Sequence, residues 1–331
     1  MTRLSTVGLF VLLSLFVLLL LQPQTYAEDI YPSRPVRLVA TAGPGGNPDV
    51  LARLLAQKLS GSLGKPFVVE NVPGAGGVVA AKMVAATPAD GQVLMLGDSG
   101  GLAINVALNP DVGYSPLKDF TPITALATVP TVLVVNGSVP AQTLDEFVKL
   151  AKSQPGKLSY GSAGYGSVHH LTMALFEERA GINLLHVPYR GGTALVNGLL
   201  TGEIQAGWSG FPNVIALIET GKLRALCVSI LKRSPSLPKV PTCDELGYGG
   251  FDIATMIGLQ ASAGLPAPIV ARIQAAAAKA LREPDVAERM LALGIELQEN
   301  GTDQYRKFMQ DDLARYTDAV KRLNLSPVKA P

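Results

Sequence analysis

Apolar positions follow two different periods along most of this chain. Short β-branched runs such as VRLVATA (36–42) and VLMLGDS (93–99) predict buried strands. Between them, leucines three or four residues apart predict an amphipathic helix over 49–63. Repeated alternation of strand and helix is typical of an α/β fold, and we expect mostly parallel strands flanked by helices.

The alternation starts again after residues 128–132, which predicts a second lobe. Thr143 with Glu146, and Thr242 with Glu245, each have the spacing of a capping box that begins a helix. Further strands are predicted over 66–71, 158–164, 182–189, 204–210, 223–229 and 251–264, and C-terminal helices over 266–283, 285–293 and 303–322. Because the last strand leads only into helices, the chain is expected to return to the first lobe.

We therefore predict two lobes joined by a hinge. Lobe 1 consists of residues 28–129 and 254–331, and lobe 2 consists of residues 130–253. The first 27 residues form a predicted signal peptide, with a basic Arg3, an apolar run shorter than a membrane span, and small residues before Glu28. Cleavage after Ala27 and export to the periplasm are expected, and an uncleaved membrane anchor is the alternative.

Composition excludes several classes of function. The chain has 28 Lys and Arg against 26 Asp and Glu, so the net charge of +2 predicts no nucleic-acid surface. Metal-binding motifs with cysteine pairs, His-Glu-x-x-His or an acidic calcium loop do not occur, so neither a metal nor a cofactor is expected. Cys227 and Cys243 permit a disulfide in an exported protein, although two free cysteines fit the sequence as well. We expect a monomer whose partners bind in a cleft.

The pentapeptide Gly-Asp-Ser-Gly-Gly at 97–101 surrounds the nucleophilic serine in trypsin-like proteases. In that arrangement a histidine precedes the serine. Here His169, His170 and His186 all follow Ser99. The sequence therefore favours a turn between a strand and a helix, and a hydrolase that uses Ser99 or Ser167 is the alternative.

Four predicted strands end in glycine-rich turns that lead directly into helices, at 41–49, 97–105, 162–171 and 187–195. In open α/β sheets, ligands bind beyond the carboxyl ends of the strands, where helix N-termini offer N–H groups and a partial positive charge. Serine hydroxyls at these turns add hydrogen-bond donors without adding charge. The pattern predicts a site for a carboxylate.

The segments in and between these turns carry a family resemblance. They include YPSRPVRLV (31–39), GPGGNPDVLARLLAQKL (43–59), GKPFVVENVPGAGG (64–77), ADGQVLMLGDSG (89–100), SAGYGSVHHL (162–171), HVPYRGG (186–192), GKLRAL (221–226) and PKVPTCDELG (238–247). Over nearly the whole mature chain, the sequence resembles the substrate-binding proteins of tripartite tricarboxylate transporters, the Bug or TctC-like family. The resemblance implies a type II-like periplasmic binding protein, not an enzyme, that closes on a carboxylate-bearing solute and delivers it to a membrane permease. A solute sensor that contacts a signalling partner is the alternative.

The resemblance also implies which residues hold the ligand. Candidates lie in the four turns and at the end of the strand over 204–210: Thr41, Ala42, Gly43, Gly45, Gly46, Asp49, Ser99, Gly100, Ser162, Gly164, Tyr165, Gly166, Ser167, His170, Tyr189, Gly191, Trp208 and Ser209. Tyr165 and Trp208 are either aromatic walls of the pocket or packing residues. At most one of the adjacent His169 and His170 is expected to reach the cleft, because adjacent helical positions face about 100° apart, and His170 is expected to support its loop.

One departure from the family pattern concerns the far end of the ligand. Family members often have Phe-Asp-Asn where this chain has Trp208-Ser209-Gly210. A buried ammonium group needs an anionic partner or several neutral ones. We therefore expect an aromatic or aliphatic mono- or dicarboxylate rather than an amino acid.

Overall fold

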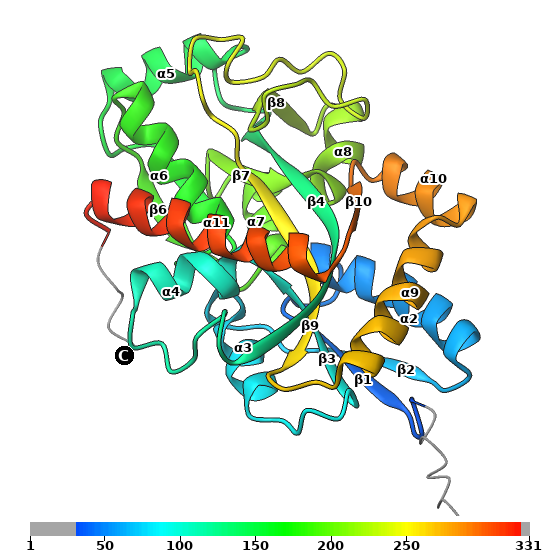
Figure 1. Ribbon diagram of the computed structural model, residues 1–331. Helices are drawn as coiled ribbons and strands as arrows, with labels where there is room; N and C mark the ends of the chain where they lie inside the picture. Colours follow the sequence, from blue (N-terminus) through cyan, green and yellow to red (C-terminus); the bar gives the residue numbers. More distant parts are fainter. Residues whose placement is uncertain (1–30, 326–331) are drawn as a thin grey trace, which may run out of the picture.

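The computed structural model describes residues 31–325, so the predicted signal peptide and its cleavage site lie outside the described residues. A continuous sheet runs through the molecule, with helices on both faces (Figure 1). Its strands are ordered β2 (Phe67–Asn71), β1 (Val36–Ala40), β3 (Val93–Asp98), β9 (Ala254–Ser262), β4 (Phe120–Asn136), β7 (Ala206–Gly210), β5 (Ser159–Ser162) and β6 (Leu185–Pro188). Two further strands, β8 (Leu223–Val228) and β10 (Glu296–Asn300), also pair with β4.

Strand β4 joins the two halves of this sheet. Its residues from Phe120 to Pro130 pair with β9, whereas those from Thr131 onward pair with β7 and β8. Pairing therefore passes from one half of the sheet to the other between Pro130 and Thr131.

The expectation of mostly parallel strands is wrong for the centre of the sheet. Strand β1 pairs in parallel with β2 and β3, and β5 pairs in parallel with β6 and β7. Every pairing that involves β4 or β9 is antiparallel. The physical reason is that β4 takes the chain out of the first half and β9 brings it back, so the two strands run in opposite directions.

Helices cover the sheet much as the apolar periodicity predicts. They are α2 (Asn47–Leu63), α3 (Val78–Ala85), α4 (Asn105–Leu108), α5 (Leu144–Ser153), α6 (Val168–Ala180), α7 (Gly192–Thr201), α8 (Phe211–Glu219), α9 (Ala267–Leu281), α10 (Pro284–Ala292) and α11 (Thr302–Arg322). A 3₁₀ turn at Ala75–Gly77 leads into α3, and a π-helical turn at Gly100–Ile104 leads into α4. The predicted helices over 266–283, 285–293 and 303–322 are confirmed within two residues at each end.

Helix α11 packs against both halves of the sheet (Figure 1). Tyr305 and Met309 belong to a core cluster with residues of β3 and α3, whereas Tyr316 and Val320 belong to the cluster that contains Trp208. The C-terminal helix thus contributes to the hydrophobic core on both sides of the crossing.

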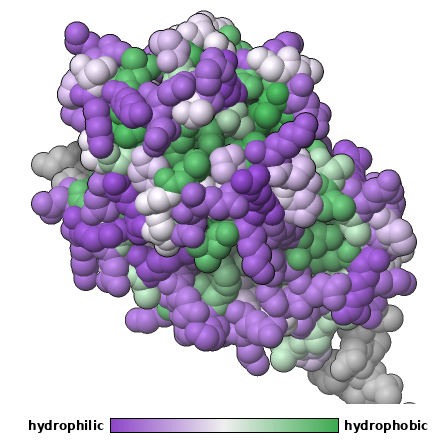
Figure 2. Space-filling view, turned by 90° about the horizontal axis from the view of Figure 1, so that it is seen from above, coloured by the Kyte–Doolittle hydropathy of each residue, from purple (hydrophilic) through white to green (hydrophobic). Residues whose placement is uncertain are grey.

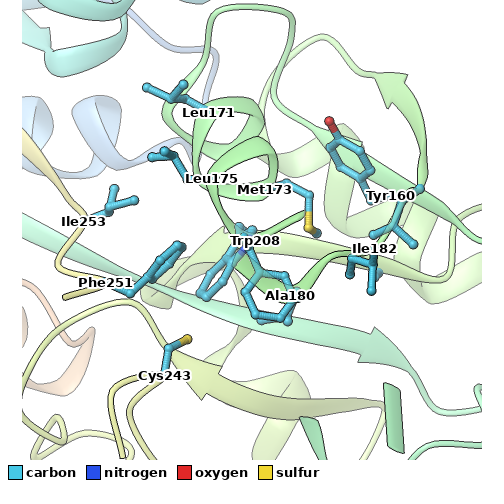
Figure 3. Packing of buried hydrophobic residues seen from close by; sticks show 14 of the residues in the cluster. Tyr160, Leu171, Met173, Leu175, Ala180, Ile182, Trp208, Cys243, Phe251 and Ile253 are labelled. Atoms are coloured by element: carbon cyan, nitrogen blue, oxygen red, sulfur yellow. The ribbon is translucent and has the colours of Figure 1, made fainter. Parts of the chain in front are cut away.

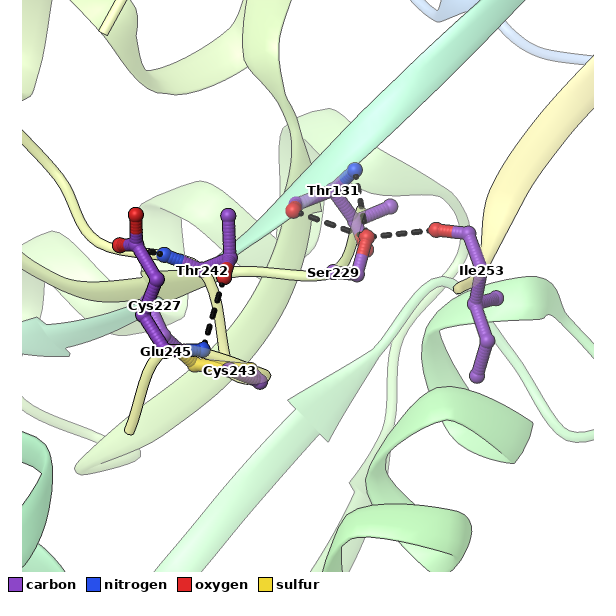
Figure 4. Close-up of a disulfide and its surroundings, with 7 residues drawn as sticks. All are labelled: Thr131, Cys227, Ser229, Thr242, Cys243, Glu245 and Ile253. Carbon is purple, nitrogen blue, oxygen red and sulfur yellow. Dashed lines mark hydrogen bonds between the residues drawn. A yellow bond between two sulfur atoms is a disulfide. The ribbon is translucent and has the colours of Figure 1, made fainter. Parts of the chain in front are cut away.

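The two predicted capping boxes have different outcomes. Thr143 Oγ1 accepts a hydrogen bond from the Glu146 N–H at 3.2 Å and begins α5, as predicted. Thr242 Oγ1 likewise accepts from the Glu245 N–H at 3.0 Å, but a turn follows in place of the predicted helix (Figure 4). Gly247, with φ +89°, takes a left-handed conformation that stops a helix from continuing.

The sequence left the state of the two cysteines open, and the structure contains a Cys227–Cys243 disulfide with a Cα–Cα distance of 5.3 Å. Nearby, Ser229 connects the two strands that cross between the halves (Figure 4). Its hydroxyl oxygen lies 3.1 Å from the Thr131 N–H and 2.5 Å from the carbonyl of Ile253. Ser229 thus ties the end of β8 to both crossings, and the disulfide ties β8 to the turn that contains Cys243.

Most of the surface shown in Figure 2 is hydrophilic, with apolar residues in separate patches. Large exposed apolar side chains include Leu231, Leu246 and Leu291. Within residues 31–325, no helix combines the length and apolar character that a membrane span requires.

Candidate functional site

A cavity of about 500 Å³ opens where the loops after β1, β2, β3, β5 and β6 meet. Half of the predicted ligand-binding residues line it, namely Thr41, Ala42, Gly43, Gly46, Gly100, Gly164, Ser167, Tyr189 and Gly191. Their placement fits the predicted site, and their contact with a ligand stays a prediction.

Four helices begin at the wall of this cavity. Gly46, Gly77, Ser167 and Gly191 are the N-cap residues of α2, α3, α6 and α7, and all four line the cavity. A helix N-terminus carries a partial positive charge because its first N–H groups have no partner within the helix. The cavity is therefore electrostatically suited to an anion.

Asp49 and Gly45 lie behind the first loop instead of lining the cavity. The buried Asp49 carboxylate accepts hydrogen bonds from the Gly45 N–H at 2.9 Å and from Asn71 at 2.8 Å, and it pairs with Arg53. Burial alone would raise the pKa of Asp49, but the hydrogen bonds from Arg53, Gly45 and Asn71 hold it below the usual value. A carboxylate engaged in this way positions the loop, so the position of Asp49 does not support its assignment as a ligand residue.

Ser99 is buried and does not line the cavity, so its position does not support its assignment as a ligand residue either. Its hydroxyl donates to Asp312 Oδ2 at 2.7 Å and accepts from the Met256 N–H at 3.2 Å. The first residue after β3 points into the protein because strand β9 and helix α11 cover that side. Ser99 therefore ties α11 to the sheet and is not placed as a nucleophile.

The neighbouring Asp98 lines the cavity, although the sequence analysis did not select it. Its Oδ1 accepts from the N–H groups of Gly100 at 3.0 Å and Gly101 at 3.3 Å, and its Oδ2 accepts from Thr41 Oγ1 at 3.3 Å. Burial raises the pKa of Asp98 despite these hydrogen bonds. Asp98 thus holds the turn after β3 through one oxygen and joins it to the loop after β1 through the other.

The loop before α6 is held by its own side chains. Ser167 Oγ accepts from the His170 N–H at 3.3 Å and donates to the Gly164 carbonyl at 2.6 Å. Ser162 Oγ also contacts the Gly164 carbonyl and lies 2.7 Å from His186 Nε2. Gly164 and Ser167 reach the cavity, whereas Ser162 is fully buried beneath them.

Gly166, Tyr165 and His170 complete the support of this loop, and none of them lines the cavity. His170 Nδ1 accepts from the Gly166 N–H at 3.4 Å, and its ring stacks on His186 with centroids 4.4 Å apart. The Tyr165 ring lies 4.4 Å from His170 on another side. The supporting role expected for His170 is confirmed, and its assignment together with Gly166 and Tyr165 to the ligand is not supported by their positions.

His169 is the histidine that faces the cavity. Both of its ring nitrogens are buried and have no hydrogen-bond partner among the described residues. His169 lines the cavity and His170 does not, in keeping with the expectation that at most one of two adjacent helical residues reaches the cleft. Which histidine of the pair reaches the cavity depends on how α6 packs, because both side chains belong to the first turn of the helix.

All three histidines of the chain should remain neutral in the folded protein until strongly acidic pH. Burial lowers the pKa of His169 and His186 to about 4, and burial with the neighbouring His186 lowers that of His170 to about 3. An unfolded histidine has a pKa of about 6.5, so between about pH 6.5 and 4 the unfolded chain binds protons that the folded chain does not. Each histidine therefore reduces the free energy of unfolding as the pH falls through this range, and has no such effect above it.

NMR titration of the imidazole C–H signals tests this expectation directly. We expect no histidine signal to shift between pH 7.5 and 5.5. A midpoint near 6.5 for His169 would mean that its ring is solvated, contrary to the structure.

The residues Trp208 and Ser209 do not form the far wall of the cavity. Trp208 is fully buried beside Phe251, with ring centroids 5.4 Å apart (Figure 3). The Phe176 ring lies edge-on to Trp208, with centroids 6.1 Å apart. Ser209, on the other face of β7, is also fully buried. Since β7 lies between β4 and β5 and both its faces are covered, neither side chain lines the cavity, and of the two roles left open for Trp208 its position supports packing.

Part of the cavity lining was not predicted from the sequence. These residues are Asn47, Pro48, the loop 73–77, Asp98, Ala163, Val168, His169, Arg190, Gly192, Asn213 and Thr255. In the described part of the chain, Asp98 and Arg190 are the lining residues with formal charge. Within the same part, no group of three His, Cys, Asp or Glu side chains is placed to hold a metal ion.

Comparison with known proteins gives a consistent family assignment. Residues 51–325 match the profile of the tripartite tricarboxylate transporter family receptor, TctC. The chain is 35% identical over 296 residues to protein BugT of Bordetella pertussis, covering 89% of this chain and 91% of that protein.

Solved structures agree with this assignment. A structure described as a periplasmic transporter superposes with a TM-score of 0.87 at 34% identity, covering 89% of this chain and 99% of that one. Rpa4515 of R. palustris with adipate has a TM-score of 0.87 at 32% identity, with 90% and 100% covered. MatC of Rhodopseudomonas palustris with bound malate has a TM-score of 0.84 at 32% identity, with 88% and 100% covered.

Proposed function

The chain belongs to the tripartite tricarboxylate transporter receptor family, and we propose that it binds a small carboxylate in the cavity described above and delivers it to a membrane permease. Proteins of this family are solute receptors of a transport system and not enzymes. The buried hydroxyl of Ser99, bound to Asp312, is in keeping with that assignment.

One observation is the main support for a carboxylate as the ligand. Four helices begin at a single cavity, and their N-termini face it. Glycine-rich backbone and small polar side chains form much of its wall. A hydrogen bond to a charged group contributes about 1.5 to 3 kcal/mol. A few such bonds, less the cost of association, account for micromolar binding at about −8 kcal/mol.

Two relatives support the same ligand class. Each is 32% identical to this chain, and their structures contain adipate and malate, respectively. A thermal-shift screen of the purified protein against adipate, malate and other carboxylates tests the proposal. A ligand that binds only the folded state at 100 times its Kd adds about 2.7 kcal/mol of stability. If no carboxylate raises the melting temperature, the proposed function fails.

We also propose that the ligand lacks a positively charged group. Asp98 is the acidic residue of the described lining, and both its oxygens are engaged by Thr41 and the backbone of Gly100 and Gly101. An ammonium group in the cavity would therefore lack a free anionic partner. Burial, which raises the pKa of Asp98, weakens that option further.

Competition between matched acids tests this point. Each carboxylic acid that binds is paired with its amino-substituted analogue, for example succinate with aspartate and adipate with 2-aminoadipate. We expect the unsubstituted acid to bind at least about tenfold more tightly, since an unpaired buried charge costs more than 1.4 kcal/mol. Tighter binding of the amino acids throughout the series would overturn the assignment.

The proposed lobes, residues 28–129 with 254–331 and residues 130–253, would close on the solute about the crossings in β4 and before β9. The antiparallel β4–β9 pairing and the contacts of Ser229 support a hinge there. Small-angle scattering should give a smaller radius of gyration with ligand than without.

Export to the periplasm, proposed from the sequence before Glu28, is supported by the periplasmic relative. N-terminal sequencing of the exported protein tests it.

A further inference from the structure

Asn105 lies behind the cavity wall at the first residue of α4. Its side-chain Nδ2 donates to the carbonyl of Gly100 at 3.0 Å and to the carbonyl of Gly166 at 3.0 Å. The carbonyl of Gly76 is also close, at 3.5 Å. One amide group therefore faces three backbone carbonyls.

These carbonyls belong to three separate loops of the cavity. Gly76 and Gly100 line the cavity themselves and follow β2 and β3 in one half of the sheet. Gly166 follows β5 in the other half and stands between the lining residues Gly164 and Ser167. The Asn105 side chain is thus bonded to loops on both sides of the cleft.

Glycine is required where Asn105 makes two of these approaches. An added Cβ at Gly166 would lie 2.3 Å from Asn105 Oδ1, and one at Gly76 would lie 2.6 Å from Asn105 Nδ2. Both glycines also have positive φ, +73° and +60°, which other residues rarely adopt. The two loops are therefore shaped around this asparagine.

We propose that Asn105 is a positioning residue that holds the three loops together in the closed cavity and so slows release of the solute. The consequence for release rests on the proposed function. Other bonds between the halves, such as Ser236 to Leu291 and Arg315 to Asp252, involve residues outside the cavity lining. Asn105 therefore joins the cleft-facing loops themselves.

Hydrogen exchange without any ligand tests the positioning role independently of the proposed function. In Asn105→Ala we expect amides of 74–77, 97–101 and 163–167 to exchange about tenfold faster, in line with the loss of two hydrogen bonds. The matched control is Asn136→Ala, because Asn136 Nδ2 donates to the Leu199 carbonyl at 2.6 Å within one half of the sheet. Unchanged exchange in all three loops, or equal acceleration by the control, would overturn the proposal.

Stopped-flow binding with adipate, or with malate if adipate does not bind, separates association from release. We expect Asn105→Ala to dissociate about tenfold faster with little change in the association rate. Asn105→Asp should release the ligand faster still, because it turns a donor into an oxygen that faces three carbonyl oxygens. A change confined to the association rate would contradict the proposal, whereas failure of both acids to bind the parent protein would count against the proposed function alone.

A double-mutant cycle removes doubt about general damage to the fold. Gly166→Ala places its methyl group against Asn105, and the three nearest atoms to that methyl all belong to Asn105. We expect Gly166→Ala to accelerate loop exchange less in the Asn105→Ala background than in the parent protein. Strictly additive effects would show that the two residues act separately and would overturn the inference.

Discussion

Replacing Gly43 with leucine should abolish carboxylate binding without destabilising the protein. Gly43 lines the cavity, has no positive φ, and an added Cβ would have no atom of the described chain within 4 Å. The new side chain can therefore occupy ligand space without backbone strain. We expect the affinity for adipate or malate to fall at least about 100-fold, or 2.7 kcal/mol, in isothermal titration calorimetry.

Gly61→Leu is the matched control for this experiment. Gly61 is exposed on α2, and an added Cβ there also meets no atom within 4 Å of the described chain. Its affinity should equal that of the parent protein, and its stability should rise slightly because leucine favours a helix over glycine. Parent-like binding by Gly43→Leu would show that the solute lies elsewhere.

Replacing Trp208 with alanine should cost about 3 to 5 kcal/mol of unfolding free energy, the range for a large aromatic side chain in a packed core. Its ring lies beside Phe251 and Phe176, and none of it is exposed. Urea denaturation followed by circular dichroism measures the loss, since this is the one tryptophan of the chain and fluorescence would disappear with it.

The same variant distinguishes a core residue from a cavity wall. At low temperature and without denaturant, the folded fraction of Trp208→Ala should bind adipate or malate with an affinity close to that of the parent protein, because Trp208 does not line the cavity. A loss of stability below about 1 kcal/mol, together with weakened binding, would favour the other role that the sequence left open for Trp208, a wall of the pocket.

The fold is predicted best where neighbouring residues decide it. Leucine spacing in α2, the Thr143 cap of α5 and the apolar periodicity of α9 and α11 each specify a helix through contacts within a few residues. The turn after Thr242 shows the limit of this approach. There the local cap forms, but a left-handed Gly247 prevents the helix.

The strand directions depend on partners far apart in the chain. Strand β10 was not predicted because its sequence ELQEN is polar, and it exists only because β4 offers an antiparallel edge. The antiparallel centre of the sheet likewise follows from the return of β9 to the first half. Apolar patterns indicate that a strand is buried, but they do not indicate which strand lies beside it.

In the candidate site, too, some features depend on neighbouring residues and others on contacts between distant parts of the chain. The sequence by itself determined the glycine-rich turns, the helices that follow them, and the family, because these depend on local conformation and motif. Only the tertiary structure decided that His169 faces the cavity, that Ser99 and Trp208 face inward, and that Asn105 reaches three loops. The physical reason is that a turn is specified by its own few residues, whereas the direction in which a side chain is exposed depends on strands and helices brought together from distant parts of the chain.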